Sequence, residues 1–350
     1  MSGAFADPWI ERSWRRCLSS GNKPEQEVSF DVLAPQALRR TEEGNHALVE
    51  AARPVLEKLG KAIASTRYFA ILTNAQGVVV DVNGPIDRRD RRADLITRIG
   101  VDLSEQSVGT TAIGAALAEL QPVWLHRGEH FFNGNSAYSC AGAPLFGPDG
   151  RCVGMLDLTG VDTMERPELK HLVVQSARSI ENALMPRRPN DLMIRMNWSS
   201  HSLGADTDGL ICLDQDGWVT GANPAARQMV SQLPAGGAPA VHCSEVFAMS
   251  CDVLFNAARG DALGYAQVLE VPLWSGLRLQ ALALPPGGSD APGRFSGRTT
   301  PAAPMPLKDV ETALIRKAVS EARGNVMKAA RTLGISRATV YRRLGNGKAK

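Results

Sequence analysis

The stretch SCAGAPLFGPDGRCVGMLDLTG, residues Ser139–Gly160, decides the fold of the first half of this chain. It contains two apolar runs, CAGAPLF and RCVGMLDLTG, separated by the turn sequence Gly147–Gly150. Apolar runs joined by a short glycine-containing turn are typical of a β-hairpin. The upstream run YFAILTNAQGVVVDVNG, Tyr68–Gly84, has the same form, with its turn at Asn74–Gly77. Together with QPVWLH, which ends at His126, these runs predict one antiparallel sheet.

Helices are predicted on both sides of these strands in the sequence. Apolar residues recur at helical spacing from about Glu42 to Ser65 and again over Pro167–Leu184, which indicates two amphipathic helices. A shorter helix is predicted over residues 9–19, WIERSWRRCLS. In a dimer the two long helices could pack as a bundle that carries a signal; otherwise they cover the sheet.

A second sheet-forming region spans about residues 200–285. It begins with GLICLDQDGWVTGANPAARQMV, which predicts a strand, a turn at Asp214–Gly217, a second strand, and a helix opened by Asn223 with Pro224 at its first position. The runs QVLEVPLW and LRLQALAL predict two closing strands. The stretch 285–306 is rich in Pro, Gly and Ser without apolar periodicity, which predicts a flexible linker.

Composition excludes several classes of protein. The 350 residues are 44% hydrophobic and 21% charged, which is typical of a globular chain, and no stretch approaches the roughly 18 apolar residues of a membrane span. We therefore expect no membrane partner. The first residues show no apolar export signal, so we expect a cytoplasmic protein. The six cysteines are scattered without a C-x-x-C pair, which favours free, buried thiols in a reducing compartment.

Charge is divided unevenly along the chain. The formal net charge is +3, but residues 301–350 contain eleven Lys and Arg against three Asp and Glu, a net +8 that leaves −5 for the first 300 residues. A concentrated positive charge predicts a polyanion as the partner of the C-terminal end. Double-stranded DNA is the expected partner.

The segment GNVMKAARTLGISRATVYRRL, Gly324–Leu344, predicts two short helices joined by a turn. Asn325 is positioned to cap the first helix, Gly334 to make the turn, and Ser336 to cap the second. The small residues Ala329 and Ala330 allow the helices to approach closely. Their shared core is predicted to be Leu333, Ile335, Val340 and Leu344.

The second helix, near Arg337–Leu344, is predicted to enter the major groove of DNA. Arg337 and Arg342 suit guanine edges, Thr339 suits a base or a methyl group, and Lys328 and Arg343 suit phosphates. The predicted DNA-binding residues are Lys328, Ser336, Arg337, Thr339, Tyr341, Arg342 and Arg343. The alternative is a small helical bundle with a solvated basic face.

This segment closely resembles the Fis-type helix-turn-helix that ends many bacterial sigma-54-dependent enhancer-binding activators. The stretches SWRRC at Ser13–Cys17, SVGTTAIGAALAELQPVWLHRGEHF at Ser107–Phe131, and Ser139–Gly160 resemble the input region of acetoin-catabolism-type regulators. The resemblance implies a GAF sensor domain there. GLICLDQDGWVTGANPAA, from Gly209, is similar to a PAS-type module.

These observations predict an α+β multidomain chain. Its GAF-like and PAS-like antiparallel sheets have flanking helices, and its C-terminal helix-turn-helix is all-α. The predicted segments are an N-terminal helical segment at 1–40, a GAF-like sensor at 41–186, a PAS-like module at 187–284, a linker at 285–306 and a Fis-type domain at 307–350.

One domain that this family normally contains is missing from the sequence. Those activators carry a AAA+ ATPase between sensor and tail, but this sequence has no phosphate-cradling G-x-x-x-x-G-K-S/T and no GAFTGA loop. We expect a regulator without its own ATPase, unable by itself to remodel a sigma-54 polymerase. It could repress, contact RNA polymerase directly, or interfere with a full-length relative. The alternative is a sensor or scaffold that modulates a full-length activator through protein contacts.

No enzymatic activity and no cofactor are predicted. The sequence HRGEH at His126–His130 matches the inverted zinc-protease signature H-x-x-E-H, but Gly128 opposes the helix that this chemistry requires, so no metal site is predicted. Asp157 is expected to cap the turn that follows it.

A small-molecule effector, of unknown identity, is the expected ligand of the GAF-like region. The candidate pocket residues combine aromatic walls with a few polar groups, and they are Trp124, His126, Phe131, Tyr138 and Cys140. The alternative is that these are ordinary core residues. A homodimer is predicted, because a single helix-turn-helix makes few contacts and such domains usually pair on DNA half-sites.

Overall fold

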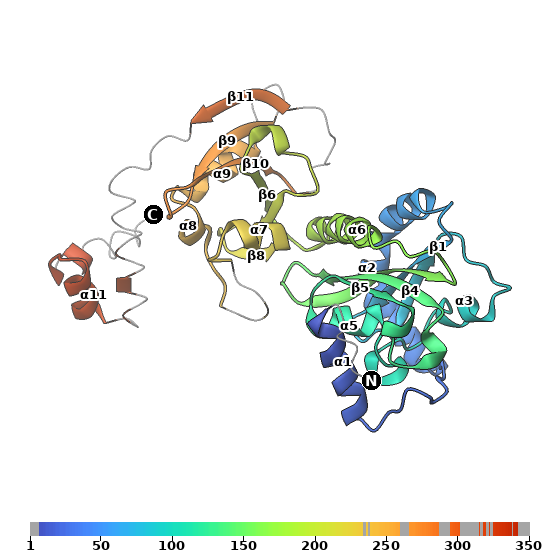
Figure 1. Ribbon diagram of the computed structural model, residues 1–350. Helices are drawn as coiled ribbons and strands as arrows, with labels where there is room; N and C mark the ends of the chain where they lie inside the picture. The colour runs from blue at the N-terminus through green and yellow to red at the C-terminus, as the bar shows by residue number, and fades with distance from the viewer. Residues whose placement is uncertain are drawn as a thin grey trace. The chain divides into compact units, whose positions relative to one another are not determined.

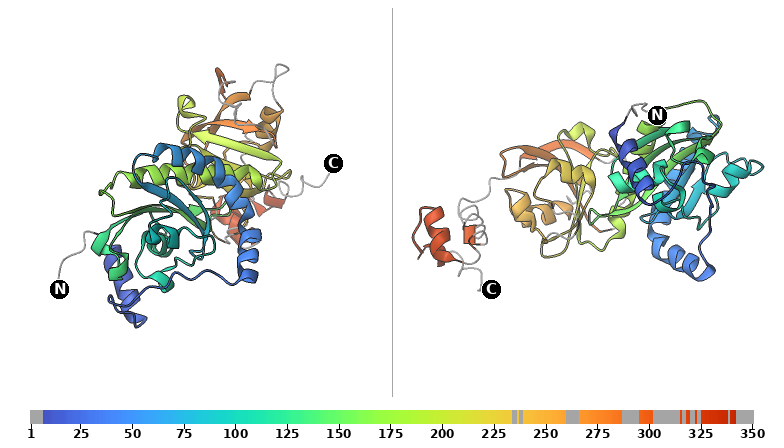
Figure 2. Two further views of the ribbon diagram at one scale, coloured as in Figure 1. Left: turned by 90° about the vertical axis from the view of Figure 1, so that its right-hand side faces the viewer. Right: turned by 60° about the horizontal axis from the view of Figure 1, so that its bottom comes forward.

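The computed structural model describes residues 7–233, 236, 239–259, 266–286 and 295–301, and in the tail residues 315, 318, 319, 322, 325–337 and 339–341. The chain divides into two compact units, Met1–Arg187 and Arg188–Lys350. Each unit contains a β-sheet with helices (Figures 1 and 2). The predicted α+β class is therefore confirmed.

The first unit is built on a five-stranded antiparallel sheet of strand order β2-β1-β5-β4-β3. Its strands are β1 Tyr68–Asn74, β2 Val79–Asn83, β3 Val123–His126, β4 Tyr138–Phe146 and β5 Cys152–Val161. Both predicted hairpins are confirmed, as β1–β2 and β4–β5. Strand β5 also pairs with β1, which joins the two hairpins in one sheet.

Two long helices cover one face of this sheet. They are α2, Pro35–Ala62, and α6, Leu169–Leu184, and Figure 1 shows them on the side opposite α1 and α5. Their buried residues, Leu48 and Val173 among them, share one core cluster with Leu156 and Leu158 of β5. These helices therefore cover the sheet within the single chain, and their packing as a bundle in a dimer stays a prediction.

Shorter helices cover the opposite face. They are α1 Pro8–Ser19, α3 Arg91–Ile96, α4 Glu105–Val108 and α5 Ala112–Glu119, with 3-10 turns at Arg127–Glu129 and Asn133–Asn135. A further 3-10 turn, Met185–Arg187, continues α6. Trp9 and Ile10 of α1 are buried in the same core cluster as Ala115 of α5. Arg16 also holds Glu105 in a two-point ion pair, with N–O distances of 2.6 and 2.9 Å. Helix α1 is thus packed into the first unit.

The second unit contains a six-stranded sheet of order β11-β9-β10-β6-β7-β8. Its strands are β6 Leu192–Asn197, β7 Gly209–Leu213, β8 Val219–Ala222, β9 Ala266–Pro272, β10 Arg278–Leu284 and β11 Phe295–Pro301. The four strands β7 to β10 were predicted from the sequence, but β6, which lies between β10 and β7, was not. The run LMIRMN lacks the signature of a short hairpin, because its partner β10 lies far along the chain and residues 198–208 separate it from its other partner, β7.

Strand β11 lies inside the stretch predicted to be a flexible linker, and it pairs with β9 in parallel. The other strand pairs described in this sheet are antiparallel, as predicted. The Gly- and Pro-rich composition around Phe295–Pro301 concealed this strand. An edge strand needs pairing on one side only, so a short run containing Thr299 and Thr300 is sufficient.

Three helices pack on one face of the second sheet, α7 Pro224–Met229, α8 Cys243–Val246 and α9 Cys251–Ala258. A further 3-10 turn spans Ser200–Ser202. The predicted start of α7 is confirmed, because the Asn223 side chain accepts a hydrogen bond from the Ala226 N–H at 2.8 Å and Pro224 is the first helical residue.

The expectation of six free thiols is wrong for two cysteines. Cys243 and Cys251 form a disulfide. The spacing between them has no familiar motif, and the two residues meet because each begins a short helix, α8 or α9, at the same edge of the unit. The remaining four, Cys17, Cys140, Cys152 and Cys212, are not in a disulfide.

In the tail the first predicted helix is present as α11, Val326–Thr332. Asn325 caps it, since its Oδ1 accepts from the Lys328 N–H at 3.1 Å. Gly334 has the positive φ of 65° expected of the turn, and Ser336 Oγ accepts from the Thr339 N–H at 3.1 Å as the second cap. None of the helices that the structure describes combines the length and apolar character required to cross a membrane.

Candidate DNA-binding tail and effector cavity

The described part of the tail has a buried side and an exposed side. Ile315, Ala330 and Val340 are buried together, with Leu333 and Ile335 packed against them. Both alanines of the predicted close approach, Ala329 and Ala330, are buried. The predicted core residue Leu344 lies outside the described residues.

The candidate DNA-binding residues of the tail lie on its exposed side where the structure describes them. Lys328, Ser336 and Arg337 are exposed, Thr339 is half-buried, and Tyr341 is 64% exposed. Arg342 and Arg343 lie outside the described residues. A guanidinium, an ammonium and an aromatic hydroxyl on one surface can contact phosphates and base edges.

A cavity lies in the first unit between the sheet and the helices of the α5 side. It measures about 30 Å³ by the space open to the centre of a water molecule, which is room for about two waters. Most of its wall is apolar, with Ile71, Ile96 and Ile113 among its members. Polar residues enter it from β4, β5 and the preceding loops, and they are Thr111, His130, Asn135, Tyr138, Cys140, Asp157 and Thr159.

A chain of polar side chains crosses this cavity. His130 Nδ1 donates to the carbonyl oxygen of Arg127 at 2.8 Å, which leaves Nε2 of the neutral ring as an acceptor 3.8 Å from Cys140 Sγ. Cys140 Sγ lies 3.2 Å from Thr159 Oγ1, and the Thr159 hydroxyl donates to Asp157 Oδ2. The register of the strands brings these polar side chains together, because Cys140 of β4 is paired with Thr159 of β5.

Burial controls the protonation of these groups. It lowers the pKa of His130 to about 4, so the ring is neutral at neutral pH. It raises the pKa of Cys140 well above its usual value, which keeps the thiol protonated. Burial also raises the pKa of Asp157 to about 7, against the opposing effect of the Thr159 hydrogen bond.

Asp157 has an unsatisfied oxygen. Its side chain is fully buried, and no described residue makes a hydrogen bond to Oδ1. A buried carboxyl oxygen without a partner costs free energy that a ligand in the cavity would recover. With a pKa near neutrality, Asp157 can either accept a hydrogen bond or, when protonated, donate one.

The structure separates the five predicted effector residues. Tyr138 and Cys140 line the cavity. Trp124 and His126 alternate along β3 with buried Val123 and Leu125, so they face the other side of the sheet. There Trp124 packs against the α2–α6 cluster, and His126 Nδ1 lies 2.6 Å from Ser139 Oγ.

Phe131, the fifth predicted residue, is buried under α1. It packs with Cys17 and Phe132, and its ring lies 5.2 Å from that of Trp14. It lies outside the cavity lining that the structure describes.

Sequence reasoning missed Asp157, Thr159 and His130 as cavity residues. The available signal was in the run LDLTG of β5, where polar Asp157 and Thr159 alternate with apolar Leu156 and Leu158. A polar pair at a spacing of two in a strand covered on both faces indicates that one face meets a polar feature.

Comparisons with known proteins give matches at both ends of the chain. Residues 12–182 match the family model described as MimR, N-terminal domain. Residues 306–346 match the model described as bacterial regulatory protein, Fis family. The first match contains the cavity, and the second contains the described part of the tail from Ile315.

Individual relatives agree with these family matches. The acetoin catabolism regulatory protein of Cupriavidus necator is 31% identical over 263 residues, 73% of this chain and 38% of that protein. The propane 2-monooxygenase operon transcriptional activator MimR of Mycolicibacterium goodii is 28% identical over 179 residues, 51% of this chain and 30% of the relative. The chain thus spans less than two fifths of the length of either. Among solved structures, the Escherichia coli DhaR(N)–DhaL complex aligns with 80% of this chain and 100% of the matched chain, at 16% identity and a TM-score of 0.49.

Two separate regions of the chain thus match families of bacterial regulators, the MimR N-terminal domain and the Fis family. Its homologues are acetoin catabolism regulators and MimR-type activators. The chain thus carries an N-terminal region that matches the MimR N-terminal domain and a tail that matches the Fis family.

Proposed function

We propose that this chain is a cytoplasmic, sequence-specific DNA-binding transcription regulator that responds to a small-molecule effector and has no ATPase of its own. The observation that carries the DNA-binding part is the Fis-family match over residues 306–346, which coincides with the region of net charge +8. The names of its relatives, a regulatory protein and a transcriptional activator, support the same function.

DNA binding through the tail is supported by the position of its candidate residues. Lys328 and Arg337 are exposed, and buried Ala330 and Val340 hold the two helices together behind them. We infer that Arg337 reads a base edge and that Lys328 contacts a phosphate, with Arg342 and Arg343 adding contacts of the same two kinds. A homodimer would place two such tails on adjacent half-sites.

Action without an ATPase is supported by the sequence between the sensors and the tail. No G-x-x-x-x-G-K-S/T occurs in the 350 residues, and residues 285–306 are too few for a motor domain. Such a regulator acts by occupying a promoter, by contacting RNA polymerase, or by pairing with a longer relative.

The effector is proposed to bind in the cavity at Asp157. The mostly apolar wall and the single unsatisfied carboxyl oxygen fit a small uncharged molecule that carries a hydroxyl and a carbonyl group. A four-carbon molecule needs more than about 30 Å³, so its binding must move the walls. That movement would couple the effector to the rest of the chain. Acetoin, which appears in the name of a relative, is the natural probe.

The DNA-binding proposal is tested by footprinting the full chain on its own promoter region at several salt concentrations. We expect a protected site whose affinity falls steeply with salt. Arg337→Ala should weaken specific binding by about 1–3 kcal/mol and relax base preference at one position. Arg151→Ala removes an exposed arginine that follows the Gly147–Gly150 turn in the first unit and serves as the matched control. Absence of any footprint would favour the scaffold function instead.

The effector proposal is tested by thermal unfolding with acetoin. We expect a rising midpoint for the first unit with increasing acetoin, because a ligand that binds only the folded state stabilises it. Asp157→Asn should weaken this response, whereas Asp149→Asn, in the exposed turn, should keep it. Equal responses from both variants would place acetoin elsewhere, and no response from the unaltered chain would reject this class of effector.

A further inference from the structure

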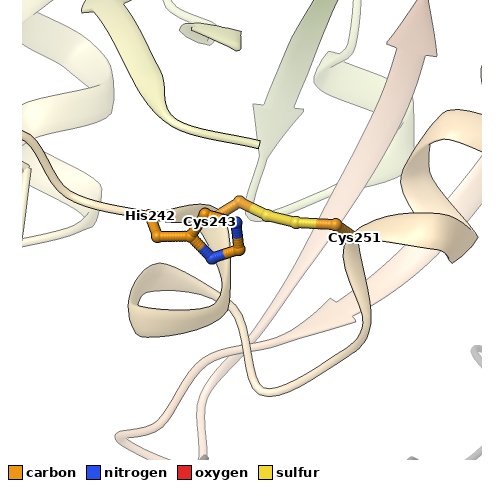
Figure 3. Close-up of side chains that lie close together, drawn as sticks. All are labelled: His242, Cys243 and Cys251. Carbon is orange, nitrogen blue, oxygen red and sulfur yellow. A yellow bond between two sulfur atoms is a disulfide. The ribbon is translucent and has the colours of Figure 1, made fainter. Parts of the chain in front are cut away.

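His242, Cys243 and Cys251 lie together at one edge of the second unit (Figure 3). One ligand atom of each side chain, the imidazole nitrogen and the two sulfurs, lies within 4.8 Å of the other two. Among the described residues this is the one group of three such side chains with the spacing of metal ligands.

Local structure fixes each of the three residues. His242 caps α8, since its Nδ1 accepts from the Ser244 N–H at 3.3 Å. Cys243 and Cys251 are the first residues of α8 and α9. The Cys243 N–H donates to the Gly217 carbonyl oxygen at 2.8 Å, which holds the β7–β8 turn against the cluster.

Gly217 lies directly beside all three ligand atoms. A Cβ at this position would lie 2.8 Å from Cys251 Sγ, 2.9 Å from His242 Nε2 and 3.1 Å from Cys243 Sγ. Zinc bonds to sulfur are about 2.3 Å and to imidazole nitrogen about 2.0–2.1 Å. Two sulfurs on one tetrahedral zinc ion lie about 3.8 Å apart, so the two sulfurs must separate from their bonded distance when the ion binds between them and the imidazole.

The donor set and its surroundings suit a zinc-class cation. Two thiolates and an imidazole are soft to intermediate ligands that bind Zn²⁺ strongly and Mg²⁺ or Ca²⁺ poorly. Cys243 is buried, whereas His242 and Cys251 are half-buried, so an ion can reach them from solvent. Asp216, Glu245 and Asp252 are close in sequence to the ligands and add negative charge.

We propose that the cluster is a redox-gated zinc site, in which the reduced chain binds one divalent cation and the disulfide form cannot. A dithiol reductant transfers two electrons and two protons to the Cys243–Cys251 bond, becoming a cyclic disulfide and leaving two thiols. The cation then displaces one proton from each thiol and bonds to both sulfurs and His242 Nε2. Oxidation of the thiolates by a disulfide oxidant reverses the sequence and releases the ion.

One further group orients the imidazole for this role. His242 Nε2 lies 2.8 Å from the Asp216 carbonyl oxygen, and Nδ1 lies 2.8 Å from Ser244 Oγ. When Nε2 binds the cation, the single ring proton moves from Nε2 to Nδ1, which then donates to Ser244 Oγ in place of accepting from the Ser244 N–H. A hydrogen bond from the second nitrogen is the usual support of a metal-bound histidine.

The test uses the full chain and Co²⁺ as a spectroscopic substitute for Zn²⁺. The protein is reduced with a phosphine, freed of excess reductant, and titrated with Co²⁺ without oxygen. We expect the visible absorption of tetrahedral Co²⁺ and a thiolate-to-cobalt band in the near ultraviolet, saturating at one ion per chain and abolished by excess Zn²⁺. The same chain oxidised before titration should show neither band.

Variants separate this site from the other thiols. Cys251→Ser and His242→Gln should weaken Co²⁺ binding at least tenfold. Cys152→Ser removes a free, half-buried thiol of the first unit and should leave binding unchanged. Since Cys251 is only half-buried, its replacement by serine should leave the fold intact, which circular dichroism checks.

Two results would overturn the proposal. One is the absence of cobalt–thiolate absorption in the reduced chain. The other is equal binding by the Cys251→Ser and Cys152→Ser chains, which would assign the ion to other ligands. Neither result bears on DNA binding by the tail, so the two proposals fail separately.

Discussion

At the scale of single residues, Asp157 has the most informative environment in the first unit. It is fully buried, one of its oxygens has no partner among the described residues, and burial raises its pKa to about 7. A carboxyl group whose pKa is higher in the folded than in the unfolded chain binds more protons when folded. Its contribution to stability is therefore complete below about pH 4 and is lost as pH rises through about 7.

Replacing this carboxyl group by an amide should remove that pH dependence. As the pH rises from 5 to 8, we expect the free energy of unfolding of Asp157→Asn to increase relative to that of the unaltered chain, by up to about 4 kcal/mol. The difference between the two chains is the quantity to measure, by denaturant unfolding at each pH. Burial lowers the pKa of His130 to about 4, which gives a pH effect of opposite sign in both chains. A difference that does not change with pH would contradict the raised pKa of Asp157.

Gly217 and Gly276 form a matched pair for testing how tightly the His–Cys–Cys cluster encloses the β7–β8 turn. Both have positive φ, 85° and 87°, so alanine is strained at either position. A Cβ at Gly276 would meet nothing within 4 Å, whereas one at Gly217 would meet all three ligand atoms.

We expect Gly276→Ala to lower the free energy of unfolding by about 1 kcal/mol, from backbone strain alone. Gly217→Ala should cost about 1–3 kcal/mol more, because three neighbouring side chains must move. Denaturant unfolding of both variants measures this difference. Equal losses would mean that the cluster is loosely packed around the turn.

Single residues also show what local sequence can predict. The caps Asn223, Asn325 and Ser336 were predicted and are confirmed, because a cap depends on residues only two or three positions away. Asp157 was expected to cap a turn, but it lies inside β5 and lines the cavity. Its surroundings depend on the register between β4 and β5 and on helix α5, which local sequence does not reveal. The predicted DNA-binding residues remain a prediction.

At the scale of elements, α1 is a helix with one buried and one exposed side. Ile10 is 1% exposed and packs in the core cluster of the first unit, whereas Leu18, on the same helix, is 54% exposed. Ion pairs from Arg12 and Arg16 to Glu119 add to the attachment, but half-exposed ion pairs contribute little. The apolar side should therefore dominate.

Truncating each side of α1 tests this view. Ile10→Ala should destabilise the first unit by about 2–5 kcal/mol, since it leaves a cavity in the core. Leu18→Ala should change stability by no more than about 0.5 kcal/mol. The measurement is denaturant unfolding followed by tryptophan fluorescence. Similar losses from both variants would show that helix content, and not burial, sets the contribution of α1.

Elements defined by local patterns were predicted well, and those defined by distant partners were not. The hairpins β1–β2 and β4–β5 have glycine-containing turns that identify them in the sequence. Strand β6 pairs with β10 and with β7, and neither pairing leaves a hairpin signature in the run LMIRMN. Strand β11 pairs with β9, in parallel, within a Gly- and Pro-rich stretch.

At the scale of the whole molecule, the two compact units should unfold as separate cooperative transitions. Calorimetry of the full chain should show two transitions that respond to different changes. Ile10→Ala should lower only the transition of the first unit. Reduction of the Cys243–Cys251 bond should lower only that of the second, by no more than about 2–3 kcal/mol for so short a loop. A single transition that responds to both changes would show that the units fold as one.

The strand order of the second sheet has a consequence for how the chain is made. Strand β6, ending at Asn197, leaves the ribosome early, but its neighbour β10 is complete only at Leu284. Through that interval one edge of β6 lacks its final partner, and open strand edges invite pairing with other chains. The first unit, whose last helix ends before β6 begins, has no such delay. Slow translation between β7 and β10 would thus prolong the time in which β6 can pair with another chain, whereas slow translation before β6 would not. A shortened chain that ends in that interval would keep the open edge permanently.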